Sequence, residues 1–176
     1  PELLIALAHD LSSESTIICN GIKDKEFINL AILSLKIGFK TILVLESPRE
    51  LDLIIEVSKE LNVRPLLGIR IKLTNKVSGN WSQSSGDRSA FGMSVEQVMK
   101  VITKLKVNNY LDCLVLQHSH LGSQIPDIIE IRKATQEACR FYSEMCKEGA
   151  PLEYLDLGGG LGAVSYTHLT LPTILL

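Results

Sequence analysis

Residues 40–73 read KTILVLESPRELDLIIEVSKELNVRPLLGIRIKL, and this stretch decides the fold. Lys40 to Leu45 is apolar and rich in β-branched residues, which predicts a buried strand, and Leu66 to Leu73 predicts the next one. Between them, Ser47-Pro48 begins a helix with proline at its first position. The apolar residues inside that helix are Leu51, Ile54, Ile55 and Val57. The stretch is therefore one strand–helix–strand unit.

The same alternation extends toward the N-terminus. Thr16 to Asn20 is a short β-branched run, and apolar residues then recur at helical spacing from Phe27 to Leu35. Asp24 is the expected N-cap of this helix, and Gly38 lies where a helix stop is expected. The predicted strands begin about 25 residues apart, as repeated β-α units do.

The spacing is wider in the second half of the chain. Residues 74–92 are rich in Ser, Gly and Asn, and this segment is longer than an ordinary connection of about 2–6 residues. After it, the pattern predicts helix 95–106, strand 111–117, helix 126–147 and strand 154–157. Because the strands are apolar throughout, we expect a parallel sheet covered on both faces.

Two α/β architectures fit this order of elements, a doubly wound sheet and a (β/α)8 barrel. Barrel enzymes place their sites at the ends of several strands, whereas a doubly wound sheet gathers its site at one switch point. The barrel is favoured because polar residues follow every predicted strand. Five strands are predicted, whereas a complete barrel has eight and needs about 250 residues. We therefore expect the chain to be incomplete at both ends. The polar residues are Asn20, Glu46, Lys72, His118 with His120, and Asp156.

Composition and charge narrow the class of protein. Hydrophobic residues make up 45% and charged residues 22%, which describes a globular chain with a core rather than a disordered one. The 18 basic and 20 acidic residues leave a net charge of −2, so no basic field attracts nucleic acid or an anionic membrane. No apolar run approaches the roughly 18 residues of a membrane span. The cysteines lack zinc or redox spacing, and we expect all four to be reduced core residues of a cytoplasmic protein: Cys19, Cys113, Cys139 and Cys146.

The first candidate site is the segment HSHLGSQ, from His118 to Gln124. Alternation along a strand places His118 and His120 on the same side. The two imidazoles could cap a layer of the barrel, and a metal site would need a third ligand that the pattern does not supply. The third alternative is an imidazole stacked on a flat cofactor ring, followed by a Gly-Ser turn that donates to phosphate. The pattern alone leaves these alternatives open.

The second candidate is DLGGGLG, from Asp156 to Gly162. Consecutive glycines after a buried strand let backbone N–H groups approach an anion, because no Cβ stands in the way. Its place at a strand end favours a phosphate site over a flexible turn. A Walker lysine and the Gly-x-Gly-x-x-Gly spacing are both missing, which excludes nucleoside triphosphate and dinucleotide sites.

The third candidate is Arg70, which shares one face of a predicted strand with Lys72. An arginine inside an apolar strand is expensive to bury unless it meets an anion, either a ligand or a structural carboxylate. The segment 78–88 that follows contains the only tryptophan, and it is either a substrate lid or a plain insertion.

Taken together, these motifs resemble the fold-type III pyridoxal-phosphate decarboxylases, and among them the branch that acts on arginine. The combination of His-x-His-Leu-Gly-Ser-Gln with a distant Asp-x-Gly-Gly-Gly-x-Gly is more specific than either half. The resemblance covers residues 1 to about 162 and implies a partial (β/α)8 TIM barrel of the alanine racemase-like type. Further matching stretches are Ile18 to Gly21 with Lys23-Asp24, Pro65 to Arg70, Ser78-Gly79 with Trp81, Ser84 to Ser89 with Phe91-Gly92, and Ala138 to Tyr142.

The resemblance also implies residue roles. His120 would stack on the pyridine ring of pyridoxal 5′-phosphate, and Arg70 would lie near that ring. The phosphate would be held by Ser123 and by the amides of Gly158, Gly159 and Gly160. The family converts arginine to agmatine and CO₂ for polyamine synthesis, with the chemistry carried by the cofactor. Ornithine or diaminopimelate decarboxylases, alanine racemase and a non-catalytic pyridoxal-phosphate carrier are the alternatives on the same barrel.

Some parts of the family's site have no counterpart in this sequence. The lysine that binds the cofactor covalently is expected before Pro1, and no lysine of this chain matches its motif. The acid that pairs the pyridine nitrogen, and the C-terminal domain of a homo-oligomer, are expected beyond Leu176. Magnesium is associated with the family, but no site for it can be read here. We therefore expect the chain alone to be inactive.

The resemblance also divides the chain. Residues 1–162 are expected to form a partial pyridoxal-phosphate-binding barrel domain. Residues 163–176, His168 included, depart from the family and look like a non-native tail translated from adapter sequence, so no part of the fold is predicted there. We expect this tail to pack poorly.

Overall fold

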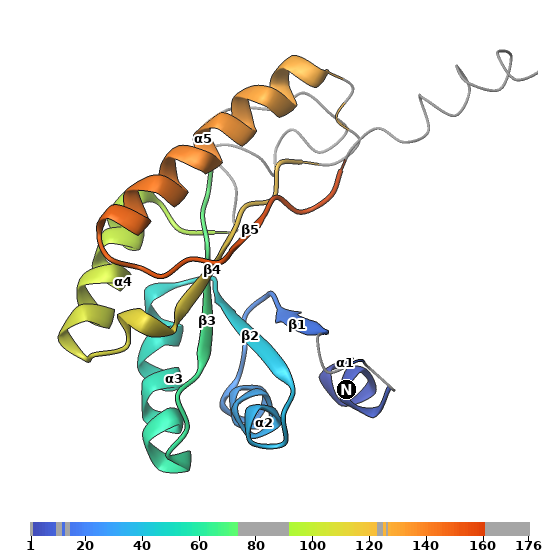
Figure 1. The fold of residues 1–176 in the computed structure, drawn as a ribbon, viewed down its shortest axis with the longest axis vertical. Coiled ribbons are helices and arrows are strands. Elements are labelled where there is room, and N and C mark those ends of the chain that lie inside the picture. Colours follow the sequence, from blue (N-terminus) through green and yellow to red (C-terminus); the bar gives the residue numbers. More distant parts are fainter. Residues whose placement is uncertain are drawn as a thin grey trace, which may run out of the picture.

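The computed structural model describes residues 2–9, 12, 15–73, 92–122, 125 and 127–160. Helices and strands alternate along these residues, and the strands form one parallel sheet (Figure 1). The helices are α1 (Glu2–Ala8), α2 (Lys25–Lys36), α3 (Pro48–Leu61), α4 (Val95–Val107) and α5 (Ile128–Lys147). The strands are β1 (Thr16–Cys19), β2 (Lys40–Leu45), β3 (Leu66–Arg70), β4 (Leu114–His118) and β5 (Tyr154–Asp156).

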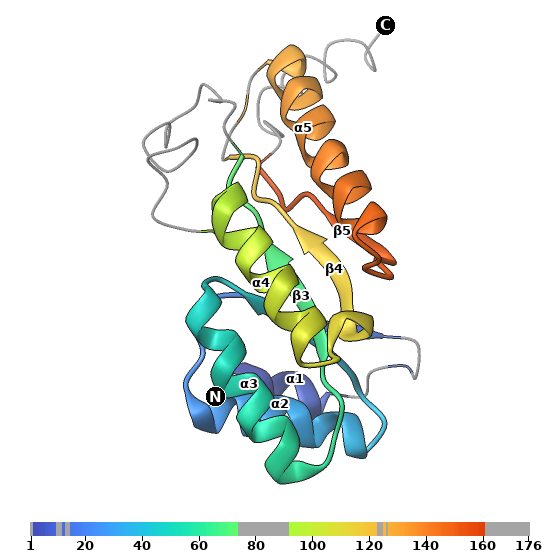
Figure 2. The same ribbon diagram turned by 90° about the vertical axis from the view of Figure 1, so that its left-hand side faces the viewer.

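The strand order in the sheet follows the chain. Each strand pairs in parallel with the next, in the order β1-β2-β3-β4-β5. A doubly wound sheet would reverse direction at a switch point, and these strands show no such reversal. The sheet is therefore part of a (β/α)8 barrel, and the predicted barrel architecture is confirmed. Seen from the side in Figure 2, helices α3, α4 and α5 lie in front of the strands.

The two faces of the sheet carry different side chains. Alternate strand residues pack under the helices in the main core, among them Leu43, Leu45, Leu67 and Ile69. The other face carries a second apolar cluster that includes Val44 and Leu116. A Cβ placed on Gly68 would lie 3.0 Å from Val44 Cγ2 and 2.8 Å from Leu116 Cδ2, so three neighbouring strands meet closely on this face.

Most predicted elements are confirmed, and their ends follow local chemistry. The Asp24 carboxylate accepts the Phe27 N–H at 2.8 Å, as its predicted N-cap role requires. Helix α1 was not predicted from the pattern. Strand β3 ends at Arg70 rather than Leu73, and a 3₁₀ turn at Leu111–Cys113 precedes β4. Helix α5 begins at Ile128 rather than Pro126, after its N-cap Asp127.

The prediction that all four cysteines belong to the core is half wrong. All are free thiols, and Cys19 and Cys113 are buried, but Cys139 and Cys146 are exposed on α5. Burial raises the pKa of the Cys19 thiol to about 11. Helix α5 turns a different stripe to the core, formed by Ala134, Ala138 and Met145. Among the described residues, no helix has the length and apolar character needed to cross a membrane.

Candidate functional site

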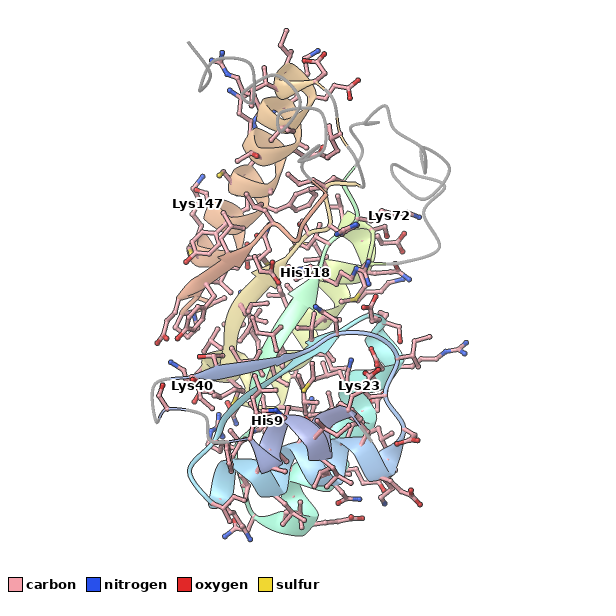
Figure 3. The ribbon with its side chains drawn as sticks, turned by 90° about the vertical axis from the view of Figure 1, so that its right-hand side faces the viewer. His9, Lys23, Lys40, Lys72, His118 and Lys147 are labelled. Carbon is pink, nitrogen blue, oxygen red and sulfur yellow. The ribbon has the colours of Figure 1, made fainter. Side chains whose placement is uncertain are left out.

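A row of polar side chains crosses the carboxyl ends of β2 to β5. Arg70 pairs with His118 across β3 and β4, and His118 pairs with Asp156 across β4 and β5. Glu46 follows the end of β2 and extends the row to Arg70, two residues beyond the Val44–Gly68 pair. Paired residues of parallel neighbours project to the same face, so these four side chains form one layer at the rim. In Figure 3, His118 and Lys72 lie near one end of the sheet and Lys40 near the other.

Arg70 meets a structural carboxylate within this row. Its Nη1 lies 2.7 Å from Glu46 Oε1, and the Glu46 side chain is only 5% exposed. The same oxygen accepts the Gly21 N–H at 3.0 Å, whereas Oε2 is buried without a hydrogen-bond partner among the described residues. The Arg70 side chain is 18% exposed, and a half-buried guanidinium needs such an anion. The pairing fixes its position at the rim.

Two further charged residues fix the loops that carry this pair. Glu50, in the first turn of α3, accepts the Glu46 N–H at 2.6 Å and the Ser47 N–H at 3.1 Å on one oxygen. Its other oxygen accepts the Lys23 N–H at 3.1 Å and lies 3.3 Å from Lys23 Nζ. That ammonium also donates to the Val44 carbonyl at 2.5 Å and to the Gly21 carbonyl. The β1–α2 and β2–α3 connections are thereby tied together at Glu46, the partner of Arg70.

His118 is a buried neutral histidine in contact with a carboxylate. Its side chain is 6% exposed, and Nδ1 lies 2.8 Å from Asp156 Oδ2, a short contact that is not aligned as a hydrogen bond. Burial lowers the pKa of the ring below its ordinary 6.5, and the nearby Arg70 and His120 lower it further, whereas Asp156 acts in the opposite direction. A neutral ring adds no second positive charge beside Arg70.

We expect the pKa of His118, followed by NMR titration of its ring in the full protein that contains this sequence, to lie below 6.5. Since the folded state favours the neutral ring, this stabilisation is present above pH 6.5 and is lost as the pH falls through the folded-state pKa. Asp156→Asn is expected to lower the pKa of His118 further, because it removes the one opposing charge. A titration midpoint above 6.5 would contradict this account.

His120 lies two residues beyond His118 and contacts the glycine turn, which is formed by Gly158 to Gly160. A Cβ built on Gly158 would lie 2.7 Å from His120 Nδ1, so the imidazole lies directly against this glycine. Gly159 is exposed, and no described residue lies within 4 Å of the same position. Backbone bonds join the two segments, since the Ser119 N–H donates to the Asp156 carbonyl and the Ile125 N–H donates to the Gly160 carbonyl, both at 2.8 Å.

The structure thus brings most of the predicted site residues to one rim. His120 and the glycine turn are adjacent, and Arg70 lies in the polar row beside them. Ser123 and the long segment 78–88 lie outside the described residues. Within the described ranges, no group of three or more His, Cys, Asp or Glu side chains could hold a metal ion.

The roles of Glu50 and Lys23 are not among those predicted from the sequence. The signal that was available is the spacing Ser47-Pro48-Arg49-Glu50, which is that of a helix capping box and places a carboxylate against the preceding backbone.

Comparison with known proteins gives consistent matches. Residues 1–173 match the family described as pyridoxal-dependent decarboxylase, pyridoxal binding domain. The biosynthetic arginine decarboxylase of Prochlorococcus marinus (strain MIT 9312) is 49% identical over 161 residues, which cover 92% of this chain and 25% of that protein. The biosynthetic arginine decarboxylase of Shewanella halifaxensis (strain HAW-EB4) is 50% identical over 166 residues, which cover 94% of this chain and 26% of that protein. The chain spans about a quarter of the length of these curated relatives.

Solved structures share the fold. The biosynthetic arginine decarboxylase SpeA from Campylobacter jejuni matches with a TM-score of 0.79 and 34% identity, covering 91% of this chain and 25% of that one. A diaminopimelate decarboxylase from M. jannaschi matches with a TM-score of 0.65 and 31% identity, and the match covers 83% of this chain and 33% of that one. An alanine racemase from Clostridium difficile 630 matches with a TM-score of 0.54 and 12% identity, and the match covers 81% of this chain and 34% of that one. At this identity the likeness shows the fold alone.

Proposed function

Because this chain belongs to the pyridoxal-dependent decarboxylases through their pyridoxal-binding domain, we propose that it forms part of the cofactor barrel of an arginine decarboxylase. The observation that carries the proposal is the contact between the His120 imidazole and Gly158 at the rim where the polar row lies. The His120 imidazole and the glycine turn follow the adjacent strands β4 and β5. This arrangement suits a cofactor that has a flat ring and a phosphate group.

The residues at the rim fit pyridoxal 5′-phosphate. The exposure of Gly159 leaves backbone N–H groups accessible to an anion, which supports a phosphate site at Gly158 to Gly160, with Ser123 as a further donor. His120 would stack on the pyridine ring, and Arg70 would lie near it. When bound, this cofactor supplies the electron sink that stabilises the charge left on the substrate when CO₂ departs.

The chain's own residues position and shield these groups. Glu46 holds the Arg70 guanidinium in one place by a 2.7 Å contact, so it is oriented before any ligand arrives. Burial of His118 lowers its pKa and so favours the neutral ring, which adds no second positive charge directly beside Arg70. Lys23 Nζ is already occupied by two carbonyls and a carboxylate, which supports a covalent lysine elsewhere in the protein.

We propose arginine as the substrate because the curated arginine decarboxylases are 46–50% identical to this chain. Residues 1–162 would be the part of the chain that belongs to the barrel domain. The family resemblance supports a cytoplasmic homo-oligomeric enzyme that acts in polyamine synthesis.

The full protein that contains this sequence is expected to release agmatine and CO₂ from arginine after loading with pyridoxal phosphate. It should show the visible absorbance of this cofactor bound covalently to a lysine. Ornithine, diaminopimelate and alanine are compared in the same assay, with and without a magnesium chelator. Preference for another of these substrates would reject arginine, and absence of the absorbance band would point to a different ligand.

His120→Ala provides the variant that tests the site. It is expected to weaken cofactor binding by about 10- to 100-fold, the effect of losing aromatic stacking on a heterocyclic ring. His9→Ala is the matched control, because His9 is an exposed histidine directly after α1 whose ring bonds locally to the Ile5 carbonyl. Equal cofactor affinity of the two variants would contradict the stacking role.

A further inference from the structure

Asp156, at the end of β5, contacts both segments of the rim at once. Its Oδ1 accepts the Gly158 N–H at 2.8 Å, and its Oδ2 lies 2.8 Å from His118 Nδ1. Its carbonyl accepts the Ser119 N–H at 2.8 Å. One residue therefore joins the start of the glycine turn to the segment that carries His120.

The hydrogen bond to Gly158 determines the shape of the turn. Gly158 has a left-handed φ of 68°, and an aspartate that accepts the N–H two residues later forms an Asx turn. The glycines that follow are free to adopt either sign of φ, so the turn has many competing shapes when nothing holds it. The carboxylate selects one of these shapes before any anion binds.

The contact with His118, which β4 holds in place, anchors the Asp156 carboxylate to the opposite segment. His118 is buried in the polar row, and two residues later His120 lies against Gly158. A shift of either segment would move the imidazole away from the turn. The carboxylate therefore fixes the glycine turn relative to His120.

We propose that Asp156 is a positioning residue that holds the glycine turn preformed to receive a phosphate group. This inference rests on the proposed function for the identity of the ligand, but not on the reaction. Preorganisation removes an ordering cost from binding, so the loss of Asp156 weakens the binding of phosphate rather than of the pyridine ring.

The experiment uses the cofactor-free form of the full protein and three probes: inorganic phosphate, pyridoxal phosphate and pyridoxal, which lacks the phosphate. Asp156→Ala is expected to weaken binding of both phosphate-bearing probes by about tenfold, the effect of one hydrogen bond to a charged group. Its affinity for pyridoxal should stay within about twofold of the wild type, because the ring site is retained.

Asp156→Asn separates the hydrogen bond from the charge. The amide oxygen can still accept the Gly158 N–H, and the amide N–H can face the neutral His118 ring, so phosphate binding should largely be restored. Glu153→Ala is the matched control, because Glu153 is an exposed acid at the opposite end of β5. Thermal unfolding of each variant verifies that the fold is retained.

The outcomes distinguish the two proposals. Wild-type phosphate affinity in Asp156→Ala, or equal loss for all three probes, would overturn the positioning role. An Asn variant as weak as the Ala variant would overturn the hydrogen-bond explanation. If phosphate binding depends on Asp156 as expected but the wild type releases no agmatine, the proposed function fails while the positioning role stands.

Discussion

Gly158→Ala should displace His120 and weaken the binding of pyridoxal phosphate by about 10- to 100-fold, the effect of losing aromatic stacking. The added Cβ would lie 2.7 Å from His120 Nδ1 and 3.4 Å from His120 Cα, so the ring has to move. Alanine at the φ of 68° found here adds conformational strain of about 1–2 kcal/mol. Fluorescence titration of the full protein measures the affinity, and thermal unfolding measures the strain.

Substitutions at two other glycines separate the displacement of His120 from the backbone strain at Gly158. Gly38 follows α2 with a φ of 94° and has no described residue within 4 Å of a built Cβ, so Gly38→Ala should lose similar stability and keep its cofactor affinity. Gly159→Ala meets none of the described residues either, and weaker binding without loss of stability would place the phosphate beside Gly159. Wild-type affinity in Gly158→Ala would show that the ring position is unimportant.

The sequence predicts the alternation of elements well where chemical signals mark their ends. Strand β2 has its predicted bounds, and α2 begins after its predicted Asp24 cap. The seven-residue α1 has no such signal at its ends. In the 3₁₀ turn Leu111–Cys113, an apolar residue stands on each side of Asp112, as in an alternating strand, and periodicity alone cannot separate the two.

The polar residues and glycines that follow the strands predict where the site lies, but not which side chains within it contact each other. His120 and the glycine turn follow neighbouring strands, so the barrel rule places them at one rim. Arg70 had two possible anions in the sequence analysis, a ligand or a carboxylate, and its partner Glu46 lies 24 residues away. Which pair forms depends on the relative position of β2 and β3, and the sequence pattern does not contain that information. Similarly, Cys139 follows the buried Ala138, and one residue of helical rotation turns it toward solvent.

Glu50→Ala should be the most destabilising of the substitutions considered. Removal of this carboxylate leaves the ammonium of Lys23 buried without its anion, and it leaves the N–H groups of Lys23, Glu46 and Ser47 without their acceptor. Loss of one partner of a buried ion pair costs about 3–5 kcal/mol. Urea unfolding of the full protein should therefore shift to a clearly lower midpoint.

Lys23→Met tests the same pair from its other side and should be less damaging. Glu50 keeps three backbone N–H donors after this change, so its charge remains solvated by the protein, and methionine fills the space of the aliphatic stem. Glu56→Ala is the control on the same helix, because its 2.7 Å pair with Lys25 is exposed and screened by water, so stability should barely change. If Lys23→Met proves as damaging as Glu50→Ala, the ammonium rather than the capping carboxylate holds these loops, and the support of Arg70 has to be assigned to Lys23.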